Sequence, residues 1–552
     1  MIPLAHSRRQ FLQFTGAAAV VAAGHRLVPA WFNAQAAAPA AKALSLLGNL
    51  DFGAVAISHA DALTVPAGFK AEVLLRRGDV LNPQGERYGD HNDYLTWLPR
   101  DERTAWLWCN HENVQLELFE GGWDGRWTEA RAAEFLRMQG GSAIRLERDG
   151  AGRWRPVLPH ADNFRADGLT TKIALGGPAA GTSWVKGARE AIGTTSNCGG
   201  GLTPWGTVCT AEENYQETWG DPEMGVAPSP AAGFFPRPSE HYGYIVELDL
   251  ATRAAVKHTA LGRFAHENVA FNTARDGRLV AYMGDDRNGE CLYKFVSDEK
   301  YEPAAGAANR RLLERGTLFA ADTEKGRWLP LDPAQTPALA RAGFDRARVC
   351  VHTRAAAKLA GATPLARPED VEVHPLTGEV YVALTSWQPG KNEAKRPAYF
   401  KEAAGAIGAL REAGGDAGAR EFEFRIFVPG GAETGLAWPD NLAFTPEQHL
   451  LVTTDFSVKP RPEAGGTQAA FGNNFLVVVP TAGPAAGQVK RFAVAPRGAE
   501  FCSPTLSPDG GELWVNVQHP GGDSTATELT SRWPNGGTSM PRSALVAIRR
   551  ET

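Results

Sequence analysis

The chain has 552 residues, of which 43% are hydrophobic and 22% are charged, the composition of a globular protein that can bury a core. Its formal net charge of −5 and isoelectric point near 6.3 argue against a nucleic-acid-binding protein, because such proteins carry a basic excess. The 60 glycines, 37 prolines and 15 tryptophans favour a turn-rich all-β protein over a helical one.

The first 39 residues are typical of an export signal rather than of a folded domain. Arg8 and Arg9 form a pair, and a weakly apolar stretch and an alanine-rich region follow them. These are the features of a twin-arginine signal peptide. The apolar run is short for a membrane span, which needs about 20 residues. We therefore expect residues 1–39 to direct export by the twin-arginine machinery, to the periplasm or the medium, without a stable membrane anchor.

A hairpin unit headed by an acidic residue or a cysteine recurs along the rest of the chain. In chain order, its copies open at Asp93, Cys198, Glu267, Glu369, Asp440 and Glu500. The copy at Glu369 is the clearest, because Val371 to Val373 alternate with the period of a strand and a Pro-x-Thr-Gly turn leads to a second strand. A four-stranded propeller blade takes about 40–50 residues, and insertions lengthen it. Six copies therefore predict an all-β fold, a six-bladed β-propeller.

The spacing between copies is uneven, so the blades must carry insertions. We expect a single β-propeller catalytic domain over residues 40–552. Its insertions are predicted near residues 140–189, 221–238, 303–359 and 391–420, the last of them partly helical.

The residues that open the six units are predicted to meet in the central channel of the propeller. Five carboxylates and a thiol around one axis repel one another unless cations neutralise them. Carboxylate oxygens suit hard cations such as Ca²⁺ or Fe³⁺, and the thiolate of Cys198 suits iron. A second ring is expected at the ends of the following strands, and it consists of Glu112, Glu213, Asp286, Asp455 and His519. Only one member of each doublet, Glu212-Glu213 and Asp285-Asp286, is expected to face inward.

An alternative interpretation assigns these acidic residues to turns, where their side chains bond backbone N–H groups. Six repeats of the placement favour a functional site, although the symmetry of the fold can also repeat a structural turn. His111, His266 and His519 are expected to be hydrogen-bonding groups or outer partners rather than primary ligands. Five of the six cysteines are expected to be buried free thiols, with Cys198 as the exception.

Arg367, two residues before Glu369, is the candidate catalytic residue because a guanidinium can bond two oxygens of a phosphate or carboxylate. The alternative for Arg367 is a salt bridge to the neighbouring carboxylates. Gly199 to Gly201 are expected to allow a tight backbone approach beside Cys198. The chain has no Gly-x-Ser-x-Gly, phosphate-binding-loop or His-Glu-x-x-His motif.

Several of these motifs together resemble the PhoX-type alkaline phosphatases. They are Asn197-Cys198-Gly199-Gly200-Gly201, Glu212-Glu213-Asn214, Arg367-Pro368-Glu369-Asp370 and Gln518-His519-Pro520-Gly521. The resemblance spans roughly Leu50 to the C-terminus. It implies twin-arginine export, a six-bladed propeller and an iron–calcium cluster in the channel.

The resemblance also implies roles for individual residues. Cys198 is an iron ligand, Glu267, Glu369 and Asp440 are ligands of iron or calcium, Glu112, Glu213 and Glu500 serve calcium, and Arg367 holds the substrate phosphate. Asp93 joins the metal ligands through its place in the ring. The function expected is hydrolysis of small phosphomonoesters. A calcium-dependent lactonase or esterase, or a non-enzymatic periplasmic calcium-binding propeller, is the alternative, and Cys198 argues against a site that holds calcium alone.

Overall fold

The computed structural model describes residues 45–119, 122–386, 404–456, 470–522, 524–525 and 527–551. The chain divides into two units, Met1–Ala38 and Pro39–Thr552, and everything below concerns the second. The predicted export signal over residues 1–39 lies outside the described residues. Among the described residues, no helix has the length and apolar character needed to cross a membrane.

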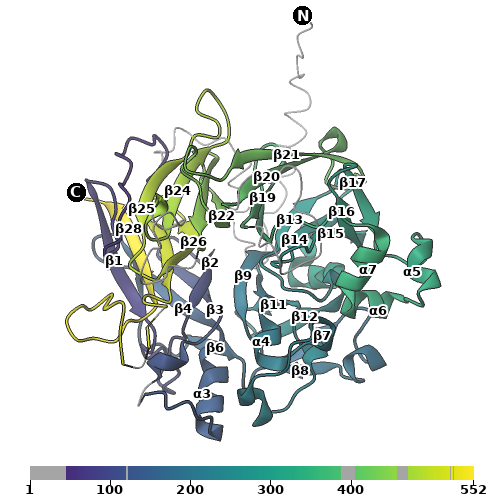
Figure 1. Ribbon diagram of the computed structural model, residues 1–552, viewed down its shortest axis with the longest axis horizontal. Helices are drawn as coiled ribbons and strands as arrows, with labels where there is room; N and C mark the ends of the chain where they lie inside the picture. Colours follow the sequence, from purple (N-terminus) through teal and green to yellow (C-terminus); the bar gives the residue numbers. More distant parts are fainter. Residues whose placement is uncertain are drawn as a thin grey trace, which may run out of the picture. The chain divides into compact units, whose positions relative to one another are not determined.

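The described strands of the second unit form six sheets, the six blades of a β-propeller (Figure 1). From the innermost strand outward, the first blade consists of β2 (Asn92–Pro99), β3 (Thr104–His111), β4 (Gly140–Arg148) and β5 (Trp154–Pro156), with β6 (Phe164–Asp167) beside β4. The second blade consists of β9 (Asn197–Leu202), β10 (Val208–Glu212), β11 (Ile245–Asp249), β12 (Ala254–His258), β7 (Lys172–Gly176) and β8 (Glu190–Ile192). The third blade consists of β13 (Ala270–Thr273), β14 (Arg278–Gly284), β15 (Leu292–Lys300), β16 (Gly316–Asp322) and β17 (Arg327–Pro330). The fourth blade consists of β18 (Pro368–Val373), β19 (Val380–Leu384), β20 (Ala406–Glu412) and β21 (Phe422–Pro429). The fifth blade consists of β22 (Pro439–Phe444), β23 (His449–Thr454), β24 (Phe475–Pro480) and β25 (Lys490–Val494). The sixth blade consists of β26 (Glu500–Leu506), β27 (Leu513–Gln518), β28 (Ala544–Arg550) and β1 (Phe69–Arg76).

The sixth blade joins the two ends of the propeller domain. Its outermost strand, β1, precedes all the other blades in the chain and pairs antiparallel with β28 along Phe69–Arg76. The ring of blades therefore cannot open without breaking the β1–β28 ladder. This closure leaves the blades with short outer edges instead of one long exposed edge.

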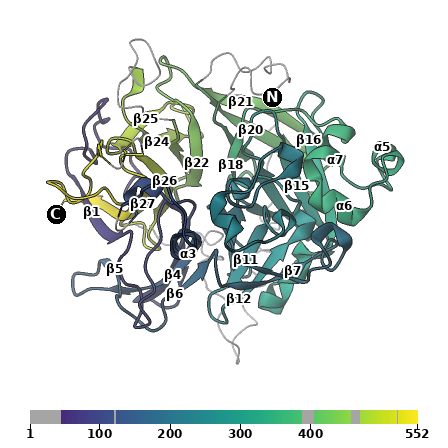
Figure 2. The same ribbon diagram turned by 60° about the horizontal axis from the view of Figure 1, so that its bottom comes forward.

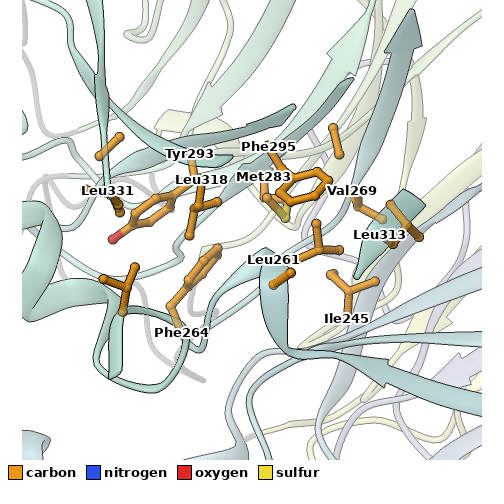
Figure 3. Packing of buried hydrophobic residues seen from close by; sticks show 14 of the residues in the cluster. Ile245, Leu261, Phe264, Val269, Met283, Tyr293, Phe295, Leu313, Leu318 and Leu331 are labelled. Atoms are coloured by element: carbon orange, nitrogen blue, oxygen red, sulfur yellow. The ribbon is translucent and has the colours of Figure 1, made fainter. Parts of the chain in front are cut away.

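Hydrophobic side chains between neighbouring blades form the core. The middle strands are buried on both faces and are continuously apolar, as in β24, Phe-Leu-Val-Val-Val-Pro. Outer strands such as β21 alternate buried and exposed side chains instead. Figure 3 shows Ile245 of β11 with Met283 of β14 and Phe295 of β15, where the second blade packs against the third. Because each blade needs the next to cover its face, the whole ring must form before any channel exists.

In three blades, the residue that follows the opening carboxylate ties the blade to the next one. The Asn268 side chain donates to the carbonyl of Val371 at 2.9 Å and accepts from its N–H at 3.0 Å. Asp370 accepts from the N–H of Leu442 at 2.7 Å, and Asn441 accepts from the N–H of Ser503 at 2.7 Å. In these three pairs, the second residue therefore makes the hydrogen bonds to backbone groups. The first residue is left free to face the channel.

Helices lie in the connections between strands. In the described part of the chain, the α-helices are α3 (Glu129–Met138), α4 (Tyr215–Trp219), α5 (Pro337–Arg341), α6 (Arg346–Val351) and α7 (Thr353–Ala360). The 3₁₀ turns are η2 (Leu116–Leu118), η3 (Ser183–Val185), η4 (Pro222–Met224), η5 (Pro230–Gly233), η6 (Ser239–His241), η7 (Thr259–Leu261), η8 (Pro303–Leu313) and η9 (Ala413–Gly415). Helices α5, α6 and α7 gather beside the third blade (Figure 2).

The structure divides the predicted insertions differently from the sequence. Residues 140–189 include β4 to β7, so much of that stretch builds the outer part of two blades. Residues 303–359 include β16 and β17, and residues 404–420 include β20, while residues 391–403 lie outside the described part of the chain. Residues 221–238 hold η4 and η5 and no strand. The sequence repeat marks only the inner hairpin of each blade, and the outer strands were mistaken for insertions because they carry no such signature.

Candidate metal centre

The six predicted opening residues all lie at the inner strands of the blades. Asp93, Cys198, Glu369, Asp440 and Glu500 are on β2, β9, β18, β22 and β26, and Glu267 comes three residues before β13. All six are buried, with at most 7% of each residue exposed. The propeller topology thus gathers side chains that are far apart in the sequence.

Ligand-type atoms of these residues and their neighbours form four overlapping groups in which all atoms lie within 4.8 Å of one another. The groups are Asp93, Glu112 and Cys198; Asp93, Glu500 and Cys502; Cys198, Glu213 and Glu267; and Glu267, Asp286 and Glu369. Seven of the eight predicted metal ligands therefore share the cluster. Asp440 is in none of the four groups, but its charge adds to burial and to the charge of Glu369 in raising the pKa of nearby Glu267.

Cys198 connects two of these groups. Its Sγ lies 3.2 Å from Oε1 of Glu267 and 3.5 Å from Oδ2 of Asp93. Two glycines make this approach possible. A Cβ on Gly199 would stand 2.2 Å from the carbonyl oxygen of Glu267, and one on Gly201 would stand 2.0 Å from that of Val269. The expected tight backbone approach beside Cys198 is confirmed, and it brings the thiol to the carboxylates of the neighbouring blades.

Burial and mutual repulsion oppose ionisation of the cluster when no cation is present. Burial, with the charge of Asp93 second, raises the pKa of Glu112 to about 8. Burial raises the pKa of Asp93 to about 6, and that of Glu369 well above its usual value. Burial and the charges of Asp93 and Glu267 raise the pKa of the Cys198 thiol in the same way. Positive charge placed among these groups would reverse all of these shifts.

Several oxygens of the cluster have no hydrogen-bond partner in the described part of the chain. They include Oδ1 of Asp93, Oε2 of Glu267 and Oε2 of Glu500, all of them buried. A buried carboxylate oxygen without a partner is costly, and a cation is the partner that suits an acceptor surrounded by acceptors. The donor set of carboxylates with a thiol fits hard cations together with a metal that accepts sulfur.

The two acidic doublets behave as expected, with one member of each facing the cluster. Glu213 and Asp286 belong to the groups above. Glu212 points into its own blade and pairs with Lys257 at 2.6 Å, with both side chains fully buried. Asp285 accepts from Nε of Arg354 at 2.8 Å. One residue of each doublet is therefore paired with a basic side chain away from the cluster, and the other belongs to the cluster.

Arg367 reaches the edge of the cluster and is held there by Asp286. Its Nε and Nη2 donate to the two oxygens of Asp286 at 2.8 Å each, and Nη2 lies 2.8 Å from Oε1 of Glu369. The guanidinium thus makes the predicted salt bridge. Its Nη1 makes no hydrogen bond to the described residues, and 20% of the side chain is exposed. The ion pair therefore fixes Arg367 while leaving donors available for a substrate.

A cavity of about 690 Å³ adjoins Arg367 and Asp286. It is lined by Asn214, Tyr215, Asp221, Glu223, Met224, Arg263, Asp286, Arg287, Asn288, Glu290, Arg354, Ala355, Lys358 and Arg367. Most of these side chains are polar or charged. The cavity provides a space where a small polar molecule can contact Arg367.

The three histidines considered in the sequence are hydrogen-bonded. His111 contacts Asn92 at 3.1 Å and Ser142 at 2.7 Å, and Nε2 of His266 contacts the carbonyl of Gly262 at 3.0 Å. Nε2 of His519 lies 3.1 Å from Oε1 of Glu500, so His519 borders the cluster through a carboxylate. That they are not primary ligands stays a prediction.

Cys502 is the residue that sequence reasoning missed. All six cysteines are buried and free, but Sγ of Cys502 joins Asp93 and Glu500 in one of the four groups. Nε2 of Gln518 contacts two members of this group, lying 2.7 Å from Oδ2 of Asp93 and 3.4 Å from the Cys502 sulfur. A signal was present, because residues i and i+2 of a strand share a face and Cys502 follows Glu500 by two.

Comparisons with known proteins place these features in a family context. The family described as Alkaline phosphatase PhoX matches residues 50–521. Among solved structures, Pseudomonas fluorescens PhoX in complex with vanadate, a transition-state analogue, aligns with a TM-score of 0.82 and 29% identity over 91% of this chain and 98% of that one. The XC5397 gluconolactonase from Xanthomonas campestris aligns with a TM-score of 0.31 and 11% identity over 90% of this chain and 98% of that one. A search of curated proteins found no match.

Proposed function

This chain belongs to the PhoX family of alkaline phosphatases, which hydrolyse phosphomonoesters, and we propose that it does so with calcium and iron ions held in its channel. The observation that carries the proposal is the cluster of buried carboxylates and thiols with unpartnered oxygens. Such a cluster is stable as anions only beside cations. Cation binding is therefore built into the same residues that border the cavity at Arg367.

The type of donor atom indicates which residues would bind iron and which would bind calcium. Cys198 offers a sulfur beside Asp93 and Glu267, a set that suits iron. Glu112, Glu213 and Glu500 offer oxygens, which suit calcium. Glu369 and Asp440 complete the ring between them. When bound, the ions supply positive charge that stabilises the phosphoryl oxygens and lowers the pKa of a water molecule.

Arg367 acts on the substrate itself. Its planar guanidinium, fixed by the two bonds from Asp286, can donate from Nη1 to a phosphate oxygen. The charge of Arg367 also lowers the pKa of Asp286 despite burial, so this carboxylate stays ionised and keeps the arginine in place. Arg367 thus orients the phosphate and stabilises the negative charge that builds up on its oxygens in the transition state.

Chelation tests the proposal directly. Purified protein is assayed with p-nitrophenyl phosphate before and after exhaustive treatment with EGTA, and again after calcium is added back. Elemental analysis follows both calcium and iron, and circular dichroism checks that the fold survives. We expect turnover to be lost when calcium is removed and to return when calcium is added back. Full activity after complete removal of metal would contradict the proposal.

The same measurements separate this proposal from the alternatives. A calcium-dependent lactonase or esterase would hydrolyse lactones, contain no iron and leave the phosphate ester intact. A non-enzymatic calcium-binding propeller would gain thermal stability from calcium but hydrolyse no ester.

We also propose that the chain is exported by the twin-arginine machinery to the periplasm or the medium. The paired Arg8 and Arg9, with the apolar and alanine-rich stretches after them, support this proposal. Cell fractionation of the wild type and of the double variant Arg8→Lys/Arg9→Lys provides the test. We expect the variant to stay in the cytoplasm; export of both proteins alike would exclude this route.

A further inference from the structure

The cavity beside Arg367 holds five basic residues, and four of them are already paired with a carboxylate. Arg367 is bound by Asp286, as described above. Arg263 pairs with Asp221 at 3.0 Å, Arg354 with Asp285 at 2.8 Å, and Lys358 with Glu290 at 2.8 Å. The fifth is Arg287, whose side chain makes no hydrogen bond or ion pair with the described residues.

The backbone holds Arg287 at the wall of this cavity. It follows Asp286 directly, in the turn between β14 and β15, where its N–H donates to the carbonyl of Asp285 at 2.7 Å and its carbonyl accepts from the N–H of Glu290 at 3.0 Å. Its charge reaches Glu217 and Asp285, but neither forms an ion pair with it. Arg287 is partly buried rather than fully in solvent. The fold therefore places a guanidinium in a partly enclosed site, and none of the described residues accepts a hydrogen bond from its side chain.

The rest of the wall indicates what kind of molecule fills this space. Met224 and Ala355 are its simple apolar side chains, and the Tyr215 hydroxyl donates to Asp221 at 2.8 Å. An aryl or alkyl group would find little apolar surface here. A polar group with its own negative charge would satisfy the donors of Arg287, while Arg367 holds the phosphoryl group that is transferred.

We propose that the preferred substrates are phosphomonoesters whose leaving group carries a second anionic group, a carboxylate or a phosphate, and that Arg287 binds it. This inference rests on the proposed function, because it places the leaving group relative to the phosphate held by Arg367. In the reaction, water adds to phosphorus, the ester P–O bond breaks, and the leaving alcohol takes a proton. Arg287 touches only the leaving group and so determines specificity.

Two nearly isosteric esters test the inference. Glycerol 3-phosphate and 3-phosphoglycerate share the transferred group, but the second has a carboxylate where the first has a hydroxymethyl group. We expect kcat/KM to favour 3-phosphoglycerate in the wild type. In Arg287→Ala, the ratio of the two kcat/KM values should fall by about 10- to 100-fold, the cost of a lost hydrogen bond to a charged group. Arg287→Lys should recover part of the ratio because it restores the charge.

Lys358→Ala is the matched control. It removes one positive charge from the same cavity, but the Lys358 ammonium is already paired with Glu290 and 61% of the side chain is exposed. If Arg287 acts by direct contact, Lys358→Ala should change the ratio by no more than about 3-fold, since a solvent-exposed ion pair contributes little. Equal ratios in the wild type and Arg287→Ala, or equal losses in both alanine variants, would overturn the inference.

Binding measurements distinguish this failure from failure of the proposed function. If neither ester is hydrolysed, the proposed function is wrong for these substrates. The affinities of the same two esters, measured by titration calorimetry, still test the role of Arg287. Tighter binding of 3-phosphoglycerate by the wild type, with the difference lost in Arg287→Ala, would support the contact. Equal affinities for the two esters would reject it.

Discussion

Buried carboxylates occur in two settings in this molecule, inside the blades and in the channel, and the two are neutralised differently. Inside the blades, Glu212 pairs with Lys257 at 2.6 Å and Glu412 with Lys294 at 3.0 Å. In the channel, acidic groups face other acidic groups, and Arg367 reaches only their edge. For each of these two carboxylates, the chain itself supplies the neutralising cation. The channel instead requires cations from outside.

Loss of the channel thiol should have the largest effect. Cys198→Ala removes the sulfur beside Asp93 and Glu267, so we expect iron to be lost from the purified protein and turnover of a phosphate ester to fall by about 100-fold or more. Iron is measured by elemental analysis and by the absorption of the wild-type protein.

Cys209→Ala is the matched control, because Cys209 is a fully buried thiol on β10 that belongs to none of the four ligand groups. It should keep its iron. Retention of iron in Cys198→Ala as well would remove Cys198 from the metal site.

Loss of a partner inside a blade should instead destabilise the fold. Lys257→Met leaves Glu212 buried without its cation, which costs about 3–5 kcal/mol of unfolding free energy. Urea denaturation measures this difference. In the channel, Glu267→Gln should not destabilise the metal-free protein, because it replaces a carboxyl whose ionisation is opposed by burial and by neighbouring carboxylates. A loss of stability in Glu267→Gln equal to that in Lys257→Met would erase the distinction between the two settings.

The smallest effect is the pH dependence of the metal-free protein. The pKa of Asp93 is raised to about 6 and that of Glu112 to about 8 in the folded state, so the folded protein binds these protons more tightly than the unfolded chain does. Their stabilising contribution is complete below about pH 4, the range of their unfolded pKa values, and is lost as the pH rises through 6 and then 8.

The melting temperature of the metal-free protein, measured in EGTA, should therefore fall by roughly several degrees between pH 5 and pH 8. Calcium should abolish most of this decline, because bound cations favour the ionised carboxylates. A melting temperature that rises with pH in EGTA would show that these groups are not destabilised as anions.

Much of the site could be predicted because it repeats. Glu267-Asn268, Glu369-Asp370 and Asp440-Asn441 are the same pair at the start of three blades, and the alternation after Glu369 identifies the strand that carries it. Cys502 was missed because it is outside the repeated position, although strand periodicity places it on the same face as Glu500. The outer strands β4, β5, β16 and β20 were missed because strands that only pack against neighbours have no shared motif.

The sequence by itself determined the fold class, the blade count and nearly all of the carboxylates that meet, since strand periodicity and repetition are local properties of the chain. Only the tertiary structure decided which member of each doublet joins the cluster, that Asp286 holds Arg367, and that the Arg287 side chain has no partner among the described residues. Those outcomes depend on side chains such as Lys257 and Arg354, which lie 45 and 69 residues from the carboxylates they bind. Contacts between such distant residues are set by the closed ring of blades, so no local pattern encodes them.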